Sequence, residues 1–198
     1  MSRSLGIEPG QEAPFFQLPN ANKSLGSDTL SLTEIMGSKG VIIAFTCNHC
    51  PYVVGSESRI EKMAAKAREN NIGFVGINSN DPINYESDSW PNMVKRASKG
   101  MSYAYLHDAD QSIATLYDAE RTPEFYLVNA SGTVVIGHSG IAKGNNTAFL
   151  IPNSGAYQGN NQTTFSQTSD RRLKKNIKLI GQSPSGINIY EFQYKVKY

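Results

Sequence analysis

Long hydrophobic runs, strong net charge and cysteine are all scarce in this chain of 198 residues. No uninterrupted apolar stretch approaches the roughly 20 residues that a membrane-spanning helix needs, so we expect no membrane partner. The net charge is +2 and charged residues make up 18% of the chain, which gives no electrostatic argument for nucleic acid as a partner. The first residues lack the apolar segment of a secretory signal, and this predicts a cytoplasmic protein.

The chain has only two cysteines, Cys47 and Cys50, and this limits the kinds of thiol or metal site that it can form. In a reducing compartment, two cysteines three positions apart indicate catalysis or metal binding rather than a structural disulfide. Zinc sites usually take four ligands, and the chain has no second paired motif and only three histidines. We therefore expect no metal and no cofactor beyond a redox-active disulfide. The expected partners are protein or small-molecule thiols and disulfides.

Alternating strands and helices are predicted by the hydrophobic pattern up to residue 136. The apolar runs at 41–45 and 72–77 are typical of strands buried on both faces, and apolar residues at helical spacing lie between them. A strand, a helix and a strand of these lengths form a right-handed βαβ unit. The same patterns predict helices at 90–99 and around 113–117, and strands at 103–106, 124–128 and 133–136, the last two flanking a hairpin turn.

The dithiol follows the first of these strands directly and should lie at the amino end of the next helix. A helix N-terminus stabilises an anion, so the pKa of the Cys47 thiol should be lowered and Cys47 should be the nucleophile. Cys50 is placed to attack a mixed disulfide formed at Cys47 and is the expected resolving thiol. His49 can carry positive charge beside the thiolate, which would make the couple more oxidising.

Three strings carry a resemblance to a known family: GQEAPFFQL at 10–18, FTCNHCPYV at 45–53 and RTPEFYLVNASGTVV at 121–135. Over residues 5–138 they resemble the thioredoxin-like redoxins of the alkyl hydroperoxide reductase and thiol-specific antioxidant superfamily. The resemblance implies an α/β thioredoxin fold, with a central mixed β-sheet flanked by helices, in a domain over residues 1–143. It also implies a cis bond before Pro123, which would face the dithiol and shape the substrate groove.

The chain departs from the patterns of that superfamily near the dithiol. Thioredoxin has Trp immediately before its first cysteine and a buried Asp six residues before it, whereas Thr46 and Val41 occupy these positions. Peroxidase members use a Thr-x-x-Cys arrangement, but Thr46 is adjacent to Cys47. These differences favour disulfide exchange over peroxide reduction. No helical pattern follows Ile136, where the closing helix of the fold would be expected.

A second segment is predicted at 144–198, where the chain becomes rich in Asn, Gly, Gln, Ser and Thr and then basic. Its composition favours extended β and coil structure. The string from Thr147 to Ile177 resembles the ends of phage tail fibres, where an endosialidase-type intramolecular chaperone begins. That resemblance implies a self-cleavage nucleophile at Ser169 with Lys174 as its partner, in a truncated chaperone that we expect to be inactive.

The sequence therefore leaves two alternative functions open. The first is a thiol–disulfide oxidoreductase, which is expected to be a monomer. The second is a tail-fibre or virion assembly protein, which is expected to form a homotrimer through residues 145–198.

Overall fold

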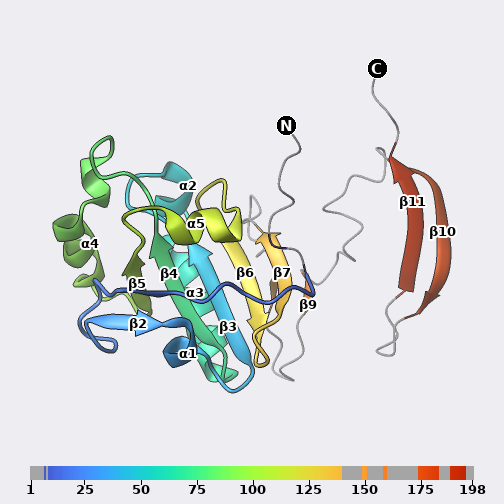
Figure 1. The fold of residues 1–198 in the computed structure, drawn as a ribbon, viewed down its shortest axis with the longest axis horizontal. Coiled ribbons are helices and arrows are strands. Elements are labelled where there is room, and N and C mark those ends of the chain that lie inside the picture. The colour runs from blue at the N-terminus through green and yellow to red at the C-terminus, as the bar shows by residue number, and fades with distance from the viewer. Residues whose placement is uncertain are drawn as a thin grey trace.

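The computed structural model describes residues 7, 9–139, 149–150, 158–159, 174–182 and 188–194. Within residues 9–139, one five-stranded mixed sheet has helices on both faces (Figure 1). This is the thioredoxin-like α/β arrangement that the sequence predicts. The strand that leads into the dithiol lies at the centre of the sheet, so the site rests on the most buried part of the fold.

The sheet has the strand order β5-β4-β3-β6-β7. Strands β3, β4 and β5 are parallel to one another, whereas β6 pairs antiparallel with both β3 and β7. Every predicted strand of this region is present within one to three residues of its expected bounds. The strands are β3 (Gly40–Phe45), β4 (Gly73–Asn78), β5 (Ala104–His107), β6 (Glu124–Asn129) and β7 (Val134–Ser139).

The helix expected after the dithiol is divided in two by Gly55 and Ser56. The four residues of α2 (Pro51–Val54) come first, and the 13 residues of α3 (Glu57–Glu69) follow. The other helical elements are α1 (Leu32–Ile35), the 3-10 helix η1 (Glu86–Asp88), α4 (Trp90–Ala97) and α5 (Ser112–Tyr117). A two-stranded sheet of β1 (Gln17–Pro19) and β2 (Thr29–Ser31) precedes α1, and β2 was not predicted.

Alternate side chains of β3 point to opposite faces of the sheet and build two separate cores. On one face, Ile42 and Ala44 pack in the same cluster as the apolar stripe of α3, whose fully or nearly fully buried members are Ile60, Met63, Ala64 and Ala67. On the other face, Val41, Ile43 and Phe45 join Tyr117 and Tyr126. Burying one large apolar side chain contributes roughly 1.5–3 kcal/mol, so β3 is fixed firmly from both sides.

The hairpin between β6 and β7 has the turn that the sequence predicts. The side-chain oxygen of Asn129 accepts from the N–H groups of Ser131 and Thr133, and Gly132 adopts a φ of +84°. This positive φ suits glycine, which has no Cβ to clash with the backbone. The hairpin follows the last residue of β6. Pro123 precedes the first residue of β6, at the opposite end of the strand and near the dithiol.

Four further strands are described in the C-terminal segment. β8 (Phe149–Leu150) pairs with β9 (Gln158–Gly159), and β10 (Lys174–Gln182) pairs with β11 (Asn188–Tyr194), both antiparallel. The boundary predicted near residue 143 lies outside the described residues. In the part of the chain that the structure describes, no helix follows β7, and none is long and apolar enough to cross a membrane.

Candidate active site

The dithiol lies where the sequence predicts, at the carboxyl end of β3. The N–H of Thr46 donates to the carbonyl oxygen of Ile77 at 2.8 Å, which extends the pairing of β3 with β4 up to the residue before Cys47. Cys50 is then the N-cap of α2, and Pro51 is in the first turn, where a missing N–H is tolerated. Both cysteines are free, with Cys47 buried and Cys50 half-buried.

Thr122 contacts both sulfur atoms of the dithiol. Its hydroxyl oxygen lies 3.1 Å from the Sγ of Cys47, and its carbonyl oxygen accepts from the Sγ of Cys50 at 3.3 Å. The peptide bond between Thr122 and Pro123 is cis. The prediction of a cis bond that faces the dithiol is therefore confirmed.

The lowered pKa predicted for Cys47 is wrong. Burial raises the pKa of the Cys47 thiol above its ordinary value, and the nearby charge of Asp88 raises it further. The Thr122 hydroxyl and the N–H of Cys50, which donates to Cys47 Sγ at 3.3 Å, lower this pKa without cancelling the effect of burial. The sequence argument failed because Cys50 occupies the N-cap position, and because the helix that follows it has only four residues.

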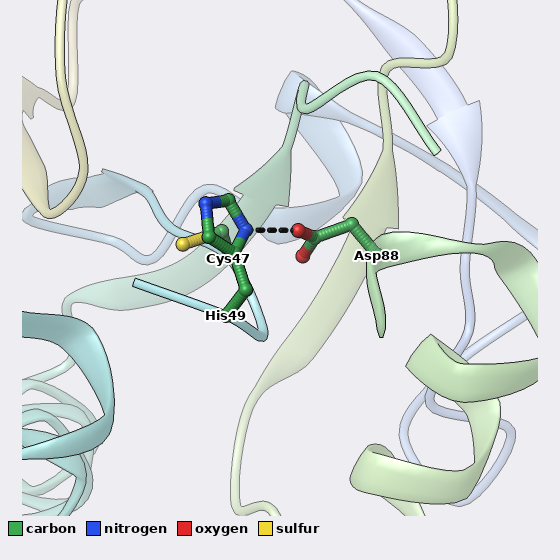
Figure 2. Close-up of side chains that lie close together, drawn as sticks. All are labelled: Cys47, His49 and Asp88. Carbon is green, nitrogen blue, oxygen red and sulfur yellow. Dashed lines mark hydrogen bonds and ion pairs between the residues drawn. The ribbon is translucent and has the colours of Figure 1, made fainter. Parts of the chain in front are cut away.

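A fully buried carboxylate, Asp88, lies beside the dithiol and was not predicted. It belongs to η1, in a segment whose sequence indicated only a polar loop. Its Oδ1 accepts from the backbone N–H of Asn48 at 2.5 Å and from the side-chain amide of Asn78 at 2.9 Å, and its Oδ2 pairs with Nδ1 of His49 (Figure 2). Asp88 thus supplies the buried acid that the chain lacks at Val41.

His49 is held by its neighbours on two sides. Its ring stacks on Tyr85, with ring centres 3.9 Å apart and planes within 6°, and Nδ1 forms an ion pair with Asp88 when the imidazole is protonated. One ligand atom each from Cys47, His49 and Asp88 lie within 4.8 Å of one another. The His49 ring therefore lies beside both the Cys47 sulfur and a buried carboxylate.

The loop that carries the dithiol is fixed by a partly buried polar network that the sequence did not reveal. Arg96 donates to the backbone oxygen of Cys47 at 2.7 Å and to Oδ1 of Asn48 at 3.2 Å, and forms an ion pair with Glu57 at 2.7 Å. The hydroxyl of Tyr105 donates to the same Asn48 oxygen at 2.8 Å. These contacts join β5, α3 and α4 to one loop and leave little freedom to the residues between the two sulfur atoms.

A cleft of about 720 Å³ opens next to the dithiol. Its walls come from the dithiol loop on one side and from α5 and the residues after it on the other. Cys50, His49 and Thr122 line the cleft, together with charged side chains of Asp118, Glu120 and Arg121. Cys50 is therefore the cysteine that lines the cleft, whereas Cys47 is fully buried.

The two residues implied by the tail-fibre resemblance are not brought together by this site. Ser169 lies outside the described residues, and Lys174 is the first residue of β10. Their pairing stays a prediction.

Comparison with known proteins adds independent findings. The profile of the AhpC/TSA family matches residues 9–141, whereas no curated protein sequence matches the chain. An uncharacterized conserved protein from Geobacillus kaustophilus is 32% identical, with a TM-score of 0.65 over 70% of this chain and 71% of that one. The hypothetical protein SMc02350 from Sinorhizobium meliloti 1021 is 30% identical, with a TM-score of 0.63 over 70% and 74% of the two chains.

A more distant structure shares the fold. A putative thiol:disulfide interchange protein DsbE from Chlorobium tepidum has a TM-score of 0.55 at 21% identity, over 67% of this chain and 85% of that one. The family profile ends at residue 141, so the tail-fibre resemblance of residues 145–198 gains no support from it. Since the profile covers more than half of the chain and includes the dithiol and Pro123, the chain belongs to the AhpC/TSA family.

Proposed function

We propose that the chain is a thiol–disulfide oxidoreductase that works through Cys47 and Cys50. The observation that carries the proposal is the contact of both sulfur atoms with Thr122, beside the cis bond and next to the cleft that Cys50 lines. A cleft of about 720 Å³ with polar and charged walls suits an extended peptide or a small disulfide. The substrates are therefore protein or small-molecule disulfides and thiols.

The exchange has two balanced steps. The Cys47 thiolate attacks one sulfur of the substrate disulfide, the substrate S–S bond breaks, and the released thiolate takes up a proton. The Cys50 thiolate then attacks the Cys47 sulfur of the mixed disulfide formed in the first step. A Cys47–Cys50 disulfide forms as the S–S bond between Cys47 and the substrate breaks, and the second substrate thiolate leaves and takes up a proton. Cys47 is the proposed nucleophile because it accepts two hydrogen bonds that favour its thiolate, from Cys50 N–H and the Thr122 hydroxyl.

His49 is the proposed proton carrier for these steps. It lines the cleft next to Cys50, and its Nδ1 is tied to Asp88, so its other ring nitrogen is left to exchange a proton with a substrate thiol. Asp88 acts through His49 by fixing the ring. Pro123, next to Thr122, shapes the wall of the groove.

Single-cysteine variants test the function and the order of the two thiols. With a mixed aromatic disulfide as substrate, Cys50→Ser should accumulate a stable adduct at Cys47, whereas Cys47→Ser should form none and Cys50 should remain free. Peptide mass spectrometry locates the adduct. An adduct only in Cys47→Ser would reverse the assigned order, and a wild-type chain that exchanges no faster than the double variant would overturn the function.

Peroxide reduction is disfavoured by the same geometry. Arg96 donates to the backbone oxygen of Cys47 rather than to its sulfur, and the buried hydroxyl of Thr46 has no hydrogen-bond partner in the described part of the chain. Arg96 is therefore directed at the backbone rather than at the sulfur, and the hydroxyl at 3.1 Å from Cys47 Sγ comes from Thr122 rather than from a Thr-x-x-Cys arrangement. Hydrogen peroxide should be consumed no faster by the wild type than by a double cysteine variant.

The assembly alternative remains a separate hypothesis drawn from residues 145–198, and it predicts a trimer. Sedimentation equilibrium of the full chain should show a monomer, and intact-mass spectrometry should show no cleavage beside Ser169. A trimer, or a fragment that Ser169→Ala abolishes, would favour the assembly alternative.

A further inference from the structure

The cluster of Cys47, His49 and Asp88 has a property that disulfide exchange does not use. It brings together one sulfur, one imidazole nitrogen and one carboxylate oxygen, all within 4.8 Å of one another (Figure 2). Cys47 and Asp88 are buried and His49 is half-buried. These three donor types are the ones that zinc takes in proteins, at about 2.0–2.3 Å from the ion.

The distances between the three atoms can be compared with those between the ligand atoms of a bound zinc ion. Ligand atoms of a tetrahedral zinc ion lie about 3.3–3.6 Å apart, as follows from its bond lengths. The Sγ of Cys47 must approach the other two atoms by at most roughly 1.3 Å, since the present separations do not exceed 4.8 Å. Nδ1 of His49 and Oδ2 of Asp88 must separate slightly, and the ion then replaces the proton that they share.

The surroundings already orient each ligand as a metal site requires. Asn48 and Asn78 hold Oδ1 of Asp88, so that Oδ2 alone turns toward His49. The stacked ring of Tyr85 fixes the plane of the His49 imidazole. Outer partners of this kind are worth about 10–100-fold in metal affinity.

A fourth ligand position would face the cleft, which His49 lines. Three protein ligands with one open position is the arrangement of a reactive zinc site, in which water or an added ligand completes the tetrahedron. We propose that the reduced chain binds one divalent ion of the zinc class through Cys47, His49 and Asp88. On binding, the Cys47 thiol releases its proton to solvent, the proton between Nδ1 of His49 and Asp88 moves to Nε2 or to solvent, and the Cys47 sulfur bonds to the ion, with no electron transferred.

The binding of an ion does not depend on the proposed exchange activity. It depends on the reduced state, because a Cys47–Cys50 disulfide has no thiolate to offer. The simplest competing explanation for any metal binding is chelation by the two cysteines alone. That explanation needs Cys50 and does not need Asp88, so variants separate the two.

The test is a titration of the full reduced chain with Co²⁺, read by the thiolate-to-cobalt absorption band, and with Zn²⁺ in competition with a chromophoric chelator. A non-thiol reductant keeps the dithiol reduced. The variants are His49→Gln, Asp88→Asn and Cys50→Ser. The matched control is His107→Gln, since His107 is also half-buried and stacks on an aromatic ring, that of Trp90, but lies outside the cluster.

One ion per chain is expected, with affinity lowered at least about tenfold in His49→Gln and in Asp88→Asn. Cys50→Ser and His107→Gln should stay within about threefold of the wild type, which is less than the loss of an outer partner causes. No binding by the wild type would overturn the proposal. Loss of binding in Cys50→Ser, with affinity kept in Asp88→Asn, would overturn it in favour of dithiol chelation.

A second measurement keeps the proposal testable if Asp88→Asn fails to fold. In the wild type, saturating Zn²⁺ should block alkylation of Cys47 and leave Cys50 open to alkylation. Protection of both cysteines to the same extent would contradict the assigned ligands. Exchange activity measured in a chelator reports on the proposed function separately, because the chelator removes the ion and leaves the Cys47 thiol free to react.

Discussion

Replacing Asp88 with Asn tests the interpretation of the site most directly. The Asp88 carboxylate is fully buried and accepts three hydrogen bonds, from the Asn48 N–H, the Asn78 amide and the His49 ring. An Asn side chain has nearly the same shape and can still accept from Asn48 and Asn78 through Oδ1. It loses the charge and the charge-assisted bond to His49.

The expected loss of stability follows from that one bond. A hydrogen bond to a charged group contributes roughly 1.5–3 kcal/mol to the free energy of unfolding. Unfolding entropy is about 2.1 cal/mol/K per residue, so for a domain of roughly 130 residues each kcal/mol corresponds to about 3–4 °C. Asp88→Asn should therefore lower the melting temperature of the reduced chain by roughly 5–11 °C.

The same substitution should lower the thiol pKa of Cys47, because the charge of Asp88 is one of the causes that raise it. Thiolate absorbance against pH measures this in a Cys50→Ser background, where Cys47 is the only thiol. Asp108→Asn is the matched control. Asp108 is also fully buried, but it accepts from Ser79 at 2.7 Å and from the N–H of Ala114 at 2.9 Å, at the start of α5.

Asp108→Asn should destabilise the fold and leave the titration of Cys47 unchanged. The reasoning is refuted if Asp88→Asn leaves the Cys47 titration in place or moves it upward. It is equally refuted if both variants shift that titration by the same amount, since the effect would then reflect general loosening of the fold.

Three further predictions concern the dithiol. The raised pKa of Cys47 contributes stability that is fully present below the ordinary thiol value of 9.0 and is lost as pH rises through the folded value. Urea unfolding should therefore show a steeper alkaline loss in the reduced wild type than in Cys47→Ala, and parallel profiles would contradict this. His49→Ala removes the partner of Asp88 and should make the Cys47–Cys50 couple more reducing by roughly tens of millivolts, where about 30 mV corresponds to 1.4 kcal/mol. An unchanged or higher reduction potential in a glutathione titration would contradict this prediction. Thr122→Val removes the hydroxyl at 3.1 Å from Cys47 Sγ, so the Cys47 pKa should rise further and alkylation at neutral pH should slow, measured again in Cys50→Ser. Faster alkylation would show that this hydroxyl does not stabilise the thiolate.

The elements that could be predicted from sequence are those with a strong periodic signal. The continuous apolar run of β3 and the helical spacing of Ile60, Met63 and Ala67 both depend on which residues are buried, and burial follows the backbone period. The three residues of β2 are too few to show a period. The break between α2 and α3 at Gly55 and Ser56 interrupts a segment whose polar and apolar residues would also suit one continuous helix.

The candidate site divides in the same way. Cys47, Cys50 and Pro123 could be predicted because each stands in a short local pattern. Asp88 stands between two serines in a polar loop, and nothing within several residues of it marks it as buried. Its burial results from contacts with Asn48 and Asn78, which are 40 and 10 positions away, so it appears only once the strands are assembled.

The absence of an acid at Val41 was a correct observation, but it did not imply that the site lacks one. The side chain of Val41 lies in the core on the face of the sheet that carries Tyr117, where a second carboxylate would be buried without a partner at a cost of several kcal/mol. Parallel strands end at the same edge of a sheet, so the end of β4 at Asn78 lies close to the end of β3 at Phe45. A residue after β4 can therefore reach the dithiol as directly as one on β3, and Asp88 does so. A carboxylate can therefore reach the dithiol from more than one place in the chain, and a comparison at the single position of Val41 tests only one of them.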